Sequence, residues 1–189
     1  MKISADAALI VIDVQQGFDA SDYWGPRNNP AADDNIALIL EAWKAADRPI
    51  VIVHHDSDES EGSNSPLAPS NPGNALKPYV AAANPSLVIA KSVNSAFYGT
   101  PDLHAWLQER KIGQLFIVGI QTNMCCETTA RMAGNLGYDV FFVADAMHTF
   151  DLKSDKGDTM TAAELARTTS INLSGGGFAT VVDTHEVVA

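Results

Sequence analysis

Cys125 is the residue of this sequence with the clearest chemical potential. It follows an apolar run that reads as a buried strand, residues 115–118, and it stands where the next helix is expected to begin. The first turn of a helix presents unpaired N–H groups and the positive end of the helix dipole, which favour a thiolate. A lone cysteine is more often a small core residue, but this position after a strand makes Cys125 a candidate nucleophile.

Two other ionisable residues end apolar runs in the same way. Asp13 follows the run at residues 8–12, and Lys91 follows the run at residues 87–90. In an open parallel sheet the ligand crevice lies outside the carboxyl ends of the strands, so the three side chains are expected to converge there. Asp13 and Lys91 alone suit a structural ion pair; together with Cys125 they suit acid–base and nucleophilic chemistry.

An alternation of strands and helices is predicted to position these residues. Apolar runs typical of strands buried on both faces recur near residues 8–13, 50–54, 87–90, 114–119, 139–143 and 178–182. Helices are expected over residues 31–46, 101–110 with Pro101 as the first residue, about 123 to 134–137, and 160–173, the last stopped by three glycines. The pattern predicts one domain over residues 1–189: a three-layer α/β/α fold of Rossmann-like topology with a mainly parallel sheet of about six strands.

Composition narrows the classes of partner. The formal charge of −11, from 12 basic and 23 acidic residues, argues against nucleic acid or an anionic membrane surface. Asp13 interrupts the first apolar run, so neither a signal peptide nor a membrane span is expected, and a cytoplasmic location is the default. A bridge between the neighbours Cys125 and Cys126 would be strained, so both are expected to be free thiols.

One long segment lacks the regular spacing of apolar residues that is typical of helices and strands. Residues 56–74 are rich in Ser, Asn, Asp, Pro and Gly. Loops of this length are uncommon in compact domains and often act as lids or binding loops. A solvated crossover without a role is the equal alternative.

Several motifs resemble those of one enzyme family. Residues 119–131, GIQTNMCCETTAR, with the later segments 137–140 and 144–146, resemble the nucleophile region of the isochorismatase-like cysteine hydrolases. That family includes nicotinamidases, N-carbamoylsarcosine amidohydrolase and ureidoacrylate amidohydrolase. Residues 13–18 resemble its first-strand motif, and residues 91–100 resemble its lysine motif. The order and spacing match nearly end to end, which implies an isochorismatase-like fold.

The resemblance also implies roles for individual residues. Asp13, Lys91 and Cys125 would form the catalytic triad. A cis peptide bond would fall between Ile120 and Gln121, and the N–H groups of Gln121 and Cys125 would form an oxyanion hole. Cys125 would then attack the carbonyl carbon of an amide, with Asp13 moving protons and Lys91 favouring the thiolate.

The histidines at the end of the second strand raise the question of a metal. Nicotinamidases carry an Asp-x-His pair with further histidines there, whereas this chain has His54, His55 and Asp56 and no histidine in the following loop. Neighbouring strand residues also point to opposite faces. We therefore expect no metal and no other cofactor.

Three residues are predicted to contact a substrate: Phe18, Phe97 and His54. Other side chains near strand ends could line a small pocket, but they could equally belong to the core: Trp24, Tyr98, Met147, His148 and Phe150.

The sequence thus favours a cysteine hydrolase that cleaves a small acyclic amide or carbamoyl carbon–nitrogen bond through a thioester. Isochorismatase-type cleavage of a vinyl ether and nicotinamidase activity are alternatives. A redox-responsive or non-catalytic binding protein is a third, motivated by the adjacent Cys125 and Cys126. Relatives usually assemble, so a homo-oligomer is expected, with the loop after His55 as a contact region.

Overall fold

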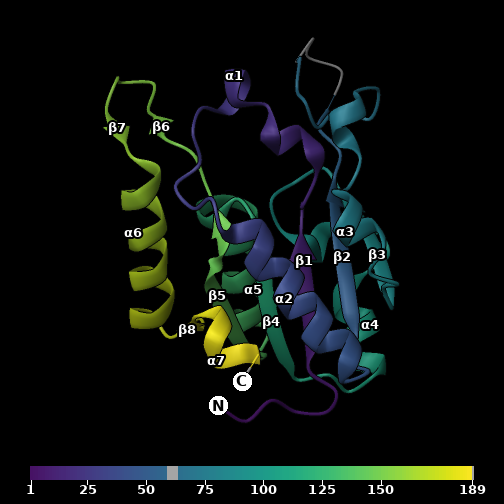
Figure 1. Cartoon of the computed structure of the whole chain (residues 1–189). Coiled ribbons are helices and arrows are strands. Elements are labelled where there is room, and N and C mark those ends of the chain that lie inside the picture. The colour runs from purple at the N-terminus through teal and green to yellow at the C-terminus, as the bar shows by residue number, and fades with distance from the viewer. Residues whose placement is uncertain (59–63, 189) are drawn as a thin grey trace.

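A six-stranded parallel sheet forms the centre of the computed structural model, which describes residues 1–58 and 64–188 (Figure 1). The strand order is β3-β2-β1-β4-β5-β8, and every pairing in this sheet is parallel. The strands are β1 (Ala8–Ile12), β2 (Ile50–His55), β3 (Leu87–Lys91), β4 (Gln114–Ile120), β5 (Asp139–His148) and β8 (Thr180–Val182). The predicted α/β fold with about six parallel strands is confirmed.

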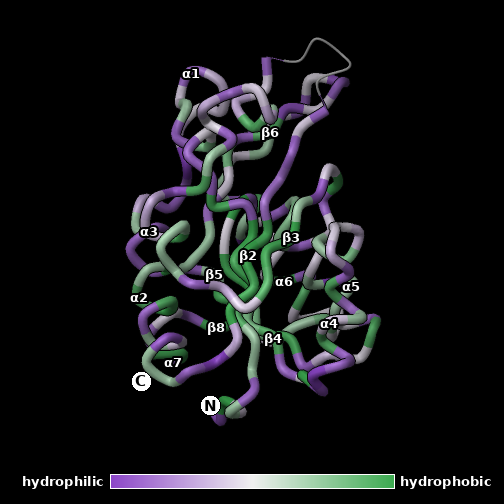
Figure 2. Tube along the Cα trace, turned by 90° about the vertical axis from the view of Figure 1, so that its right-hand side faces the viewer, coloured by the Kyte–Doolittle hydropathy of each residue, from purple (hydrophilic) through white to green (hydrophobic). Residues whose placement is uncertain are grey.

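Helices cover both faces of the sheet (Figure 2). One face carries α2 (Ala32–Ala45), α3 (Pro78–Ala81) and α7 (Thr184–Val188); the other carries α4 (Leu103–Glu109), α5 (Glu127–Asn135) and α6 (Ala162–Gly175). Alternate residues of β1 supply the two cores, since Leu9 packs with Trp43 of α2 and Ile10 with Leu103 of α4. The predicted three-layer arrangement is confirmed.

The structure differs from the expected elements in three places. Strand β8 lies at one edge of the sheet with Thr180 exposed and Val181 half-buried, so it is not buried on both faces. Strand β3 lies at the edge of the sheet with Val88 51% exposed, so it is not buried on both faces. Pro101 does not open α4, because Asp102 caps this helix by accepting a hydrogen bond from the Ala105 N–H.

Short elements gather at the carboxyl ends of the strands. Helix α1 (Ser21–Trp24) and the hairpin of β6 (Leu152–Lys153) and β7 (Thr159–Met160) lie at the upper end of Figure 1, away from both termini. The sequence patterns did not indicate α1, α3, α7 or this hairpin, which are too short for an apolar period to be recognised.

The predicted lid at residues 56–74 is only partly within the described residues, since residues 59–63 lie outside them. The described part is tied to the sheet by Asn74, whose side-chain amide donates to the carbonyl oxygens of His55 and Leu67 and to Asp56 Oδ1. Leu67 is buried beside the strand ends. This part of the segment is therefore in position to form a wall above the sheet.

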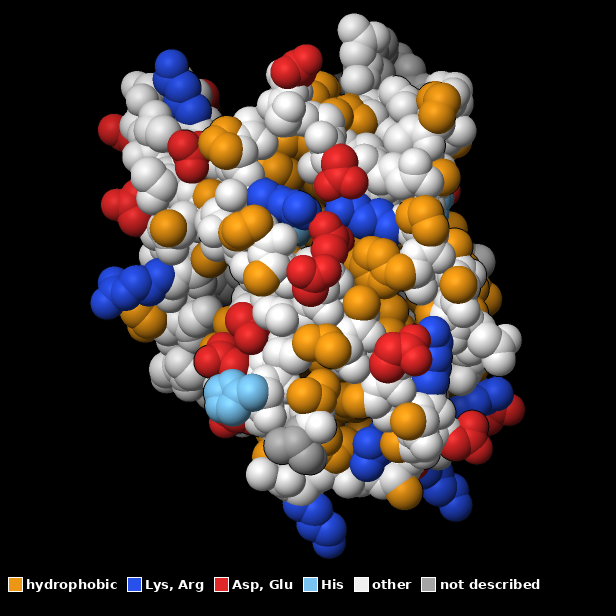
Figure 3. All heavy atoms as spheres, viewed as in Figure 1, with side chains coloured by type: hydrophobic (Ala, Val, Ile, Leu, Met, Phe, Trp, Pro, Cys, Tyr) orange, Lys and Arg blue, Asp and Glu red, His pale blue; other side chains and the backbone are white. Residues whose placement is uncertain are grey.

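Figure 3 shows the face of the molecule that carries α2. Basic side chains stand there in separate groups among acidic and hydrophobic ones. No helix among the described residues has the length and apolarity to cross a membrane.

Candidate active site

The structure brings Asp13, Lys91 and Cys125 together at the carboxyl ends of three strands. Asp13 follows β1, Lys91 ends β3, and Cys125 lies in a π-helical turn, Thr122–Cys126, between β4 and α5. Lys91 Nζ is 2.6 Å from Asp13 Oδ2 and 3.4 Å from Cys125 Sγ. The side chains of Asp13 and Lys91 are fully buried, so this ion pair is shielded from solvent.

The carboxylate of Asp13 has one oxygen engaged and one free. Oδ2 accepts from Lys91, whereas the buried Oδ1 has no hydrogen-bond partner among the described residues. The backbone of Asp13 adopts a positive φ of 52° and its N–H donates to the carbonyl oxygen of Val53. Oδ1 is therefore an unsatisfied acceptor for a proton.

The environment of Cys125 keeps its thiol protonated in the resting protein. Burial raises the pKa of Cys125, and the negative charge of Asp13 raises it further, while Lys91 lowers it. The sequence argument predicted a favoured thiolate, but that argument did not include the burial of the residue. Deprotonation of the thiol thus requires an acceptor, and a carboxylate oxygen of Asp13 lies within 4.8 Å of Cys125 Sγ.

Lys91 also contacts His55. Its Nζ lies 3.2 Å from His55 Nδ1, so the ammonium touches Asp13, Cys125 and His55 together. Burial lowers the pKa of Lys91, but its interactions with Asp13 and Cys125 together outweigh burial and raise the pKa, so Lys91 stays a cation. Ligand atoms of Asp13, His55 and Cys125 lie within 4.8 Å of one another. The Lys91 ammonium supplies the positive charge at this cluster.

A cavity of about 220 Å³ opens onto Asp13 and Cys125. Its walls combine apolar and neutral polar side chains: Phe18, Trp24, Leu67 and Met124, with His55, Ser57, Asn94 and Gln121. None of these described lining residues is a lysine or an arginine. The cavity therefore suits a small ligand without a negative charge.

Aromatic rings form one wall of the cavity. The Phe18 and Trp24 centroids are 5.0 Å apart, and Trp24 lies 5.5 Å from Phe150. The Trp24 indole N–H donates to the carbonyl oxygen of Gly17, which fixes the ring. Phe18 thus lies where a substrate contact was predicted.

Phe97 lies elsewhere. It is buried in the core on the α4 side of the sheet and stacks on Tyr138 at 6.0 Å, so it does not line the cavity. Its place within the lysine motif could not distinguish a cavity wall from the core layer beneath it.

His54 also differs from the prediction, because His55 and not His54 lines the cavity. His54 Nε2 lies 2.8 Å from the carbonyl oxygen of Asn74, and its Nδ1 lies 3.1 Å from Asp56 Oδ1. Strand alternation places the two histidines on opposite faces, but only the register of β2 decides which one faces Cys125.

The turn before Cys125 is specifically shaped. The peptide bond between Ile120 and Gln121 is cis, and β4 is irregular between Ile117 and Gly119. The Gln121 carbonyl oxygen accepts from the N–H groups of Met124 and Cys126. The turn therefore places both Gln121 and Cys125 in the lining of the cavity.

Besides His55, sequence reasoning did not single out Gln15 and Asn94, nor the cavity-lining residues Ser57, Leu67 and Met124. Gln15 is buried and hydrogen-bonds the backbone of His55, and Asn94 Oδ1 lies 3.7 Å from Cys125 Sγ. Both stand inside the two motifs already recognised, at residues 13–18 and 91–100, and that proximity was the available signal.

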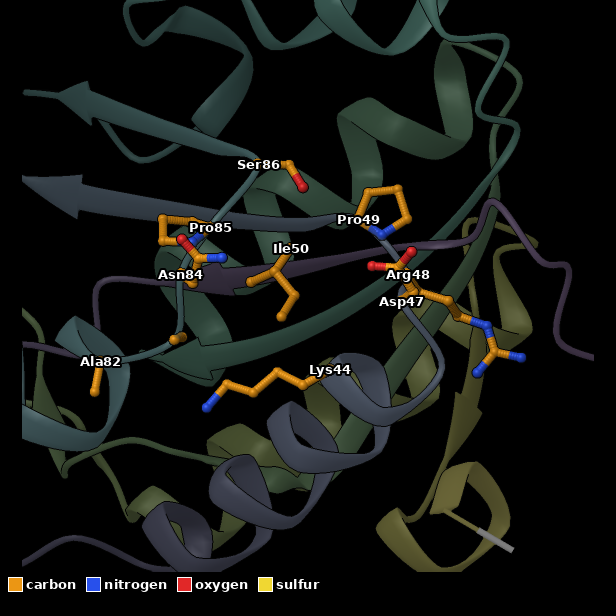
Figure 4. A pocket seen from close by; sticks show the side chains of 10 residues that line it. Lys44, Asp47, Arg48, Pro49, Ile50, Ala82, Asn84, Pro85 and Ser86 are labelled. Carbon is orange, nitrogen blue, oxygen red and sulfur yellow. The ribbon is translucent and has the colours of Figure 1, made fainter.

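A larger hollow of about 570 Å³ lies at the other end of the strands, by the amino ends of β2 and β3 (Figure 4). Its charged residues are Lys44, Asp47 and Arg48. Figure 4 shows the Lys44 and Arg48 side chains extending in different directions, so their cationic groups do not converge. This hollow is larger than the cavity beside Cys125, but its described lining residues include no cysteine, whereas Asp13 and Cys125 both line the smaller cavity.

Comparison with known proteins shows the family of this chain. The model of the isochorismatase domain matches residues 7–185, and the chain belongs to the isochorismatase family of hydrolases. The isochorismatase family protein YrdC of Bacillus subtilis is 36% identical over 181 residues, covering 96% of this chain and 94% of YrdC. A streptothricin hydrolase of Streptomyces noursei is 31% identical and covers 85% of this chain and 56% of its own length.

Solved structures share the fold. A crystal structure of an isochorismatase-family protein from Chromobacterium violaceum superposes with a TM-score of 0.89 at 37% identity, covering 99% of this chain and 94% of the other. A cysteine hydrolase from Pseudomonas syringae superposes at 0.85 and 24% identity, covering 100% and 93%, which shows the same fold.

Proposed function

We propose that this chain is a cysteine amidohydrolase that cleaves the carbon–nitrogen bond of a small amide or carbamoyl compound through a thioester on Cys125. One observation carries the proposal: Cys125 Sγ lies 3.4 Å from the Lys91 ammonium and within 4.8 Å of the Asp13 carboxylate, whose Oδ1 has no hydrogen-bond partner among the described residues. A nucleophile, a proton acceptor and a fixed cation are the groups that amide cleavage requires.

In the first half-reaction the Cys125 sulfur bonds to the carbonyl carbon while its proton passes to Asp13 Oδ1. The N–H groups of Gln121 and Cys125 stabilise the oxyanion of the tetrahedral intermediate. Asp13 then returns the proton to the nitrogen, the carbon–nitrogen bond breaks, and ammonia or an amine leaves. Lys91 holds Asp13 in place and stabilises negative charge on the sulfur throughout.

In the second half-reaction water attacks the thioester. Asp13 takes a proton from the water, the carbon–sulfur bond breaks, and the proton restores the Cys125 thiol. The products are a carboxylic or carbamic acid and the free enzyme. No redox change occurs in either half.

The cavity favours an uncharged substrate with a compact apolar acyl group. Its volume of about 220 Å³ exceeds the roughly 150 Å³ that holds benzene, so ligands of that size class fit. A substrate carboxylate would meet no unpaired cation among the described lining residues, since Lys91 is engaged by three acceptors.

The test is ammonia release from a panel of neutral and carboxylate-bearing small amides. Cys125→Ala should lower kcat/KM by about a thousandfold or more. Cys126→Ala is the matched control, because Cys126 is fully buried and does not line the cavity. Equal turnover by the Cys125→Ala protein would refute the mechanism.

Nicotinamide and isochorismate belong in the same panel as the alternatives. Nicotinamidase 3 of Arabidopsis thaliana is 37% identical over 99 residues, which cover 52% of this chain and 43% of that protein. His54 pairs with Asp56 and Asn74 here, which disfavours a nicotinamidase-like site. Turnover of isochorismate by the Cys125→Ala protein would instead indicate vinyl ether cleavage.

The redox-responsive alternative is disfavoured by Cys126. That thiol is fully buried, so oxidation of the adjacent pair would require opening the core. If the protein hydrolyses no amide of the panel and peroxide oxidises both thiols, this alternative is favoured over the hydrolase.

We also propose that the chain assembles as a homo-oligomer in the cytoplasm. Support for assembly comes from exposed apolar side chains beside the site: Val88, Val93 and Tyr98, which are 51%, 47% and 74% exposed.

A further inference from the structure

His55 makes a contact that the reaction described above leaves unused. Its Nδ1 lies 3.2 Å from Lys91 Nζ, and the two residues are register partners on β2 and β3. A lysine ammonium can only donate hydrogen bonds, so Nδ1 must accept and must carry no proton. The imidazole in this contact is therefore neutral, with its proton on Nε2.

This contact completes the coordination of the ammonium. Lys91 has three N–H donors, and three acceptors surround it: Asp13 Oδ2, Cys125 Sγ and His55 Nδ1. An ammonium at the end of a flexible stem keeps its orientation only where its donors are all satisfied. Without His55, one buried donor of Lys91 would lack a partner.

We propose that His55 is a positioning residue of this site: as a neutral acceptor it holds the Lys91 ammonium against Asp13 and Cys125. This inference rests on the proposed hydrolase function, which uses the same ammonium. Protonation of His55 removes the acceptor and places a second cation against Lys91, so it lowers activity.

The backbone of His55 is itself held in place. Gln15, which is fully buried, accepts from the His55 N–H at 2.9 Å and donates to the His55 carbonyl oxygen at 2.9 Å. Asn74 donates to the same carbonyl oxygen at 3.2 Å. These hydrogen bonds fix the position of the imidazole. A residue that orients another side chain has to be held in this way.

The surroundings keep the imidazole neutral. Burial lowers the pKa of His55, the charge of Lys91 lowers it further, and Asp13 and Asp56 partly oppose this; His54 contributes a small lowering. Together with Cys125 across the cluster, these are the titratable groups facing His55 among the described residues. The neutral form is therefore present at pH 7.

Two variants separate positioning from simple structural support. His55→Asn keeps an acceptor near the place of Nδ1 and cannot be protonated, whereas His55→Leu removes the acceptor. His185→Asn is the matched control, because His185 is exposed on α7 far from the cavity. All variants are made in a Cys126→Ala background, so that Cys125 is the sole thiol.

The first measurement is the rate at which iodoacetamide alkylates Cys125 at pH 8, which needs no substrate. His55→Leu should be slower by about tenfold, the effect of losing one hydrogen bond to a charged group, and His55→Asn should keep most of the parent rate. Imidazole ¹⁵N NMR of the parent should show the Nε2–H tautomer of His55. Undiminished alkylation in the Leu variant, or an Nδ1–H tautomer, overturns the proposal.

The second measurement is the pH dependence of kcat/KM with an amide that is turned over. In the parent, kcat/KM should fall as the pH is lowered and His55 becomes protonated. The His55→Asn variant should lack this fall, because asparagine does not titrate. An unchanged fall in the Asn variant overturns the role of His55. If alkylation is slowed in the His55→Leu variant but no amide is turned over, the hydrolase function is contradicted and the positioning role of His55 is not.

Discussion

At the scale of single residues, the Asp13–Lys91 ion pair is central both to the proposed reaction and to the predicted stability. The pair is completely buried, with 2.6 Å between Lys91 Nζ and Asp13 Oδ2. Removing one member of a buried pair leaves the other charge without compensation, which costs more than the pair contributes.

Lys91→Met should therefore lower the free energy of unfolding by about 3–5 kcal/mol. The double variant Asp13→Asn/Lys91→Met should recover much of that loss, because no isolated charge is left in the core, while remaining inactive. Urea denaturation of the two proteins measures the difference. A double variant no more stable than Lys91→Met would mean that the loss comes from packing rather than from charge.

At the scale of elements, an ionic network joins the segment carrying Phe18 and Trp24 to the helical layer. Lys77, before α3, lies 2.8 Å from Asp19 and 2.9 Å from Asp33 of α2, and Arg27 lies 2.7 Å from Asp33. Burial on its own would raise the pKa of Asp33, but hydrogen bonds from Lys77 and Arg27 outweigh it and lower the pKa to about 2.

A carboxyl group with a lowered pKa stabilises the fold above its ordinary pKa, and this stabilisation is lost as the pH falls through the lowered value. The urea midpoint of the wild-type protein should thus decline between about pH 4 and pH 2, the interval between the ordinary 3.8 and the lowered value. Asp33→Asn should be less stable at pH 7 and decline less over that interval. Parallel declines in the two proteins would exclude Asp33 as the titrating group.

Gly119 shows how one element is shaped for the site. Its φ is 128°, and a Cβ there would collide with the backbone oxygen of Ile12 on β1. Gly119→Ala should cost about 1–3 kcal/mol for the backbone conformation alone and should displace the turn that carries Gln121 and Cys125. The nearby Gly113→Ala is the control, because a Cβ there meets open space. Thermal unfolding and Cys125 alkylation would show whether only Gly119→Ala is affected.

At the scale of the whole molecule, we predict that the chain assembles into a homo-oligomer. Light scattering at micromolar concentration should give a mass of at least two chains. Tyr98→Glu beside the cavity should reduce that mass, because it places a charge among exposed apolar residues, whereas Leu38→Glu on α2 should not, although Leu38 is also 56% exposed. A monomeric wild-type protein would contradict the prediction.

The sequence by itself determined the architecture and the members of the reactive cluster. Parallel strands buried on both faces leave nearly continuous apolar runs, as the four inner strands do, whereas β3 and β8 are more exposed because they lie at the two edges of the sheet. Asp13, Lys91 and Cys125 each follow or end such a run, and the carboxyl ends of neighbouring parallel strands necessarily meet at one edge.

Only the tertiary structure decided the contacts around that cluster. His54 and His55 are equivalent in the sequence, and the register of β2 alone places His55 beside Lys91. Phe97 and Phe18 are both aromatic residues within motifs, yet one packs in the core and the other lines the cavity. The protonated state of Cys125 likewise follows from its burial, because desolvation depends on every element that packs around the thiol and not on the helix that carries it.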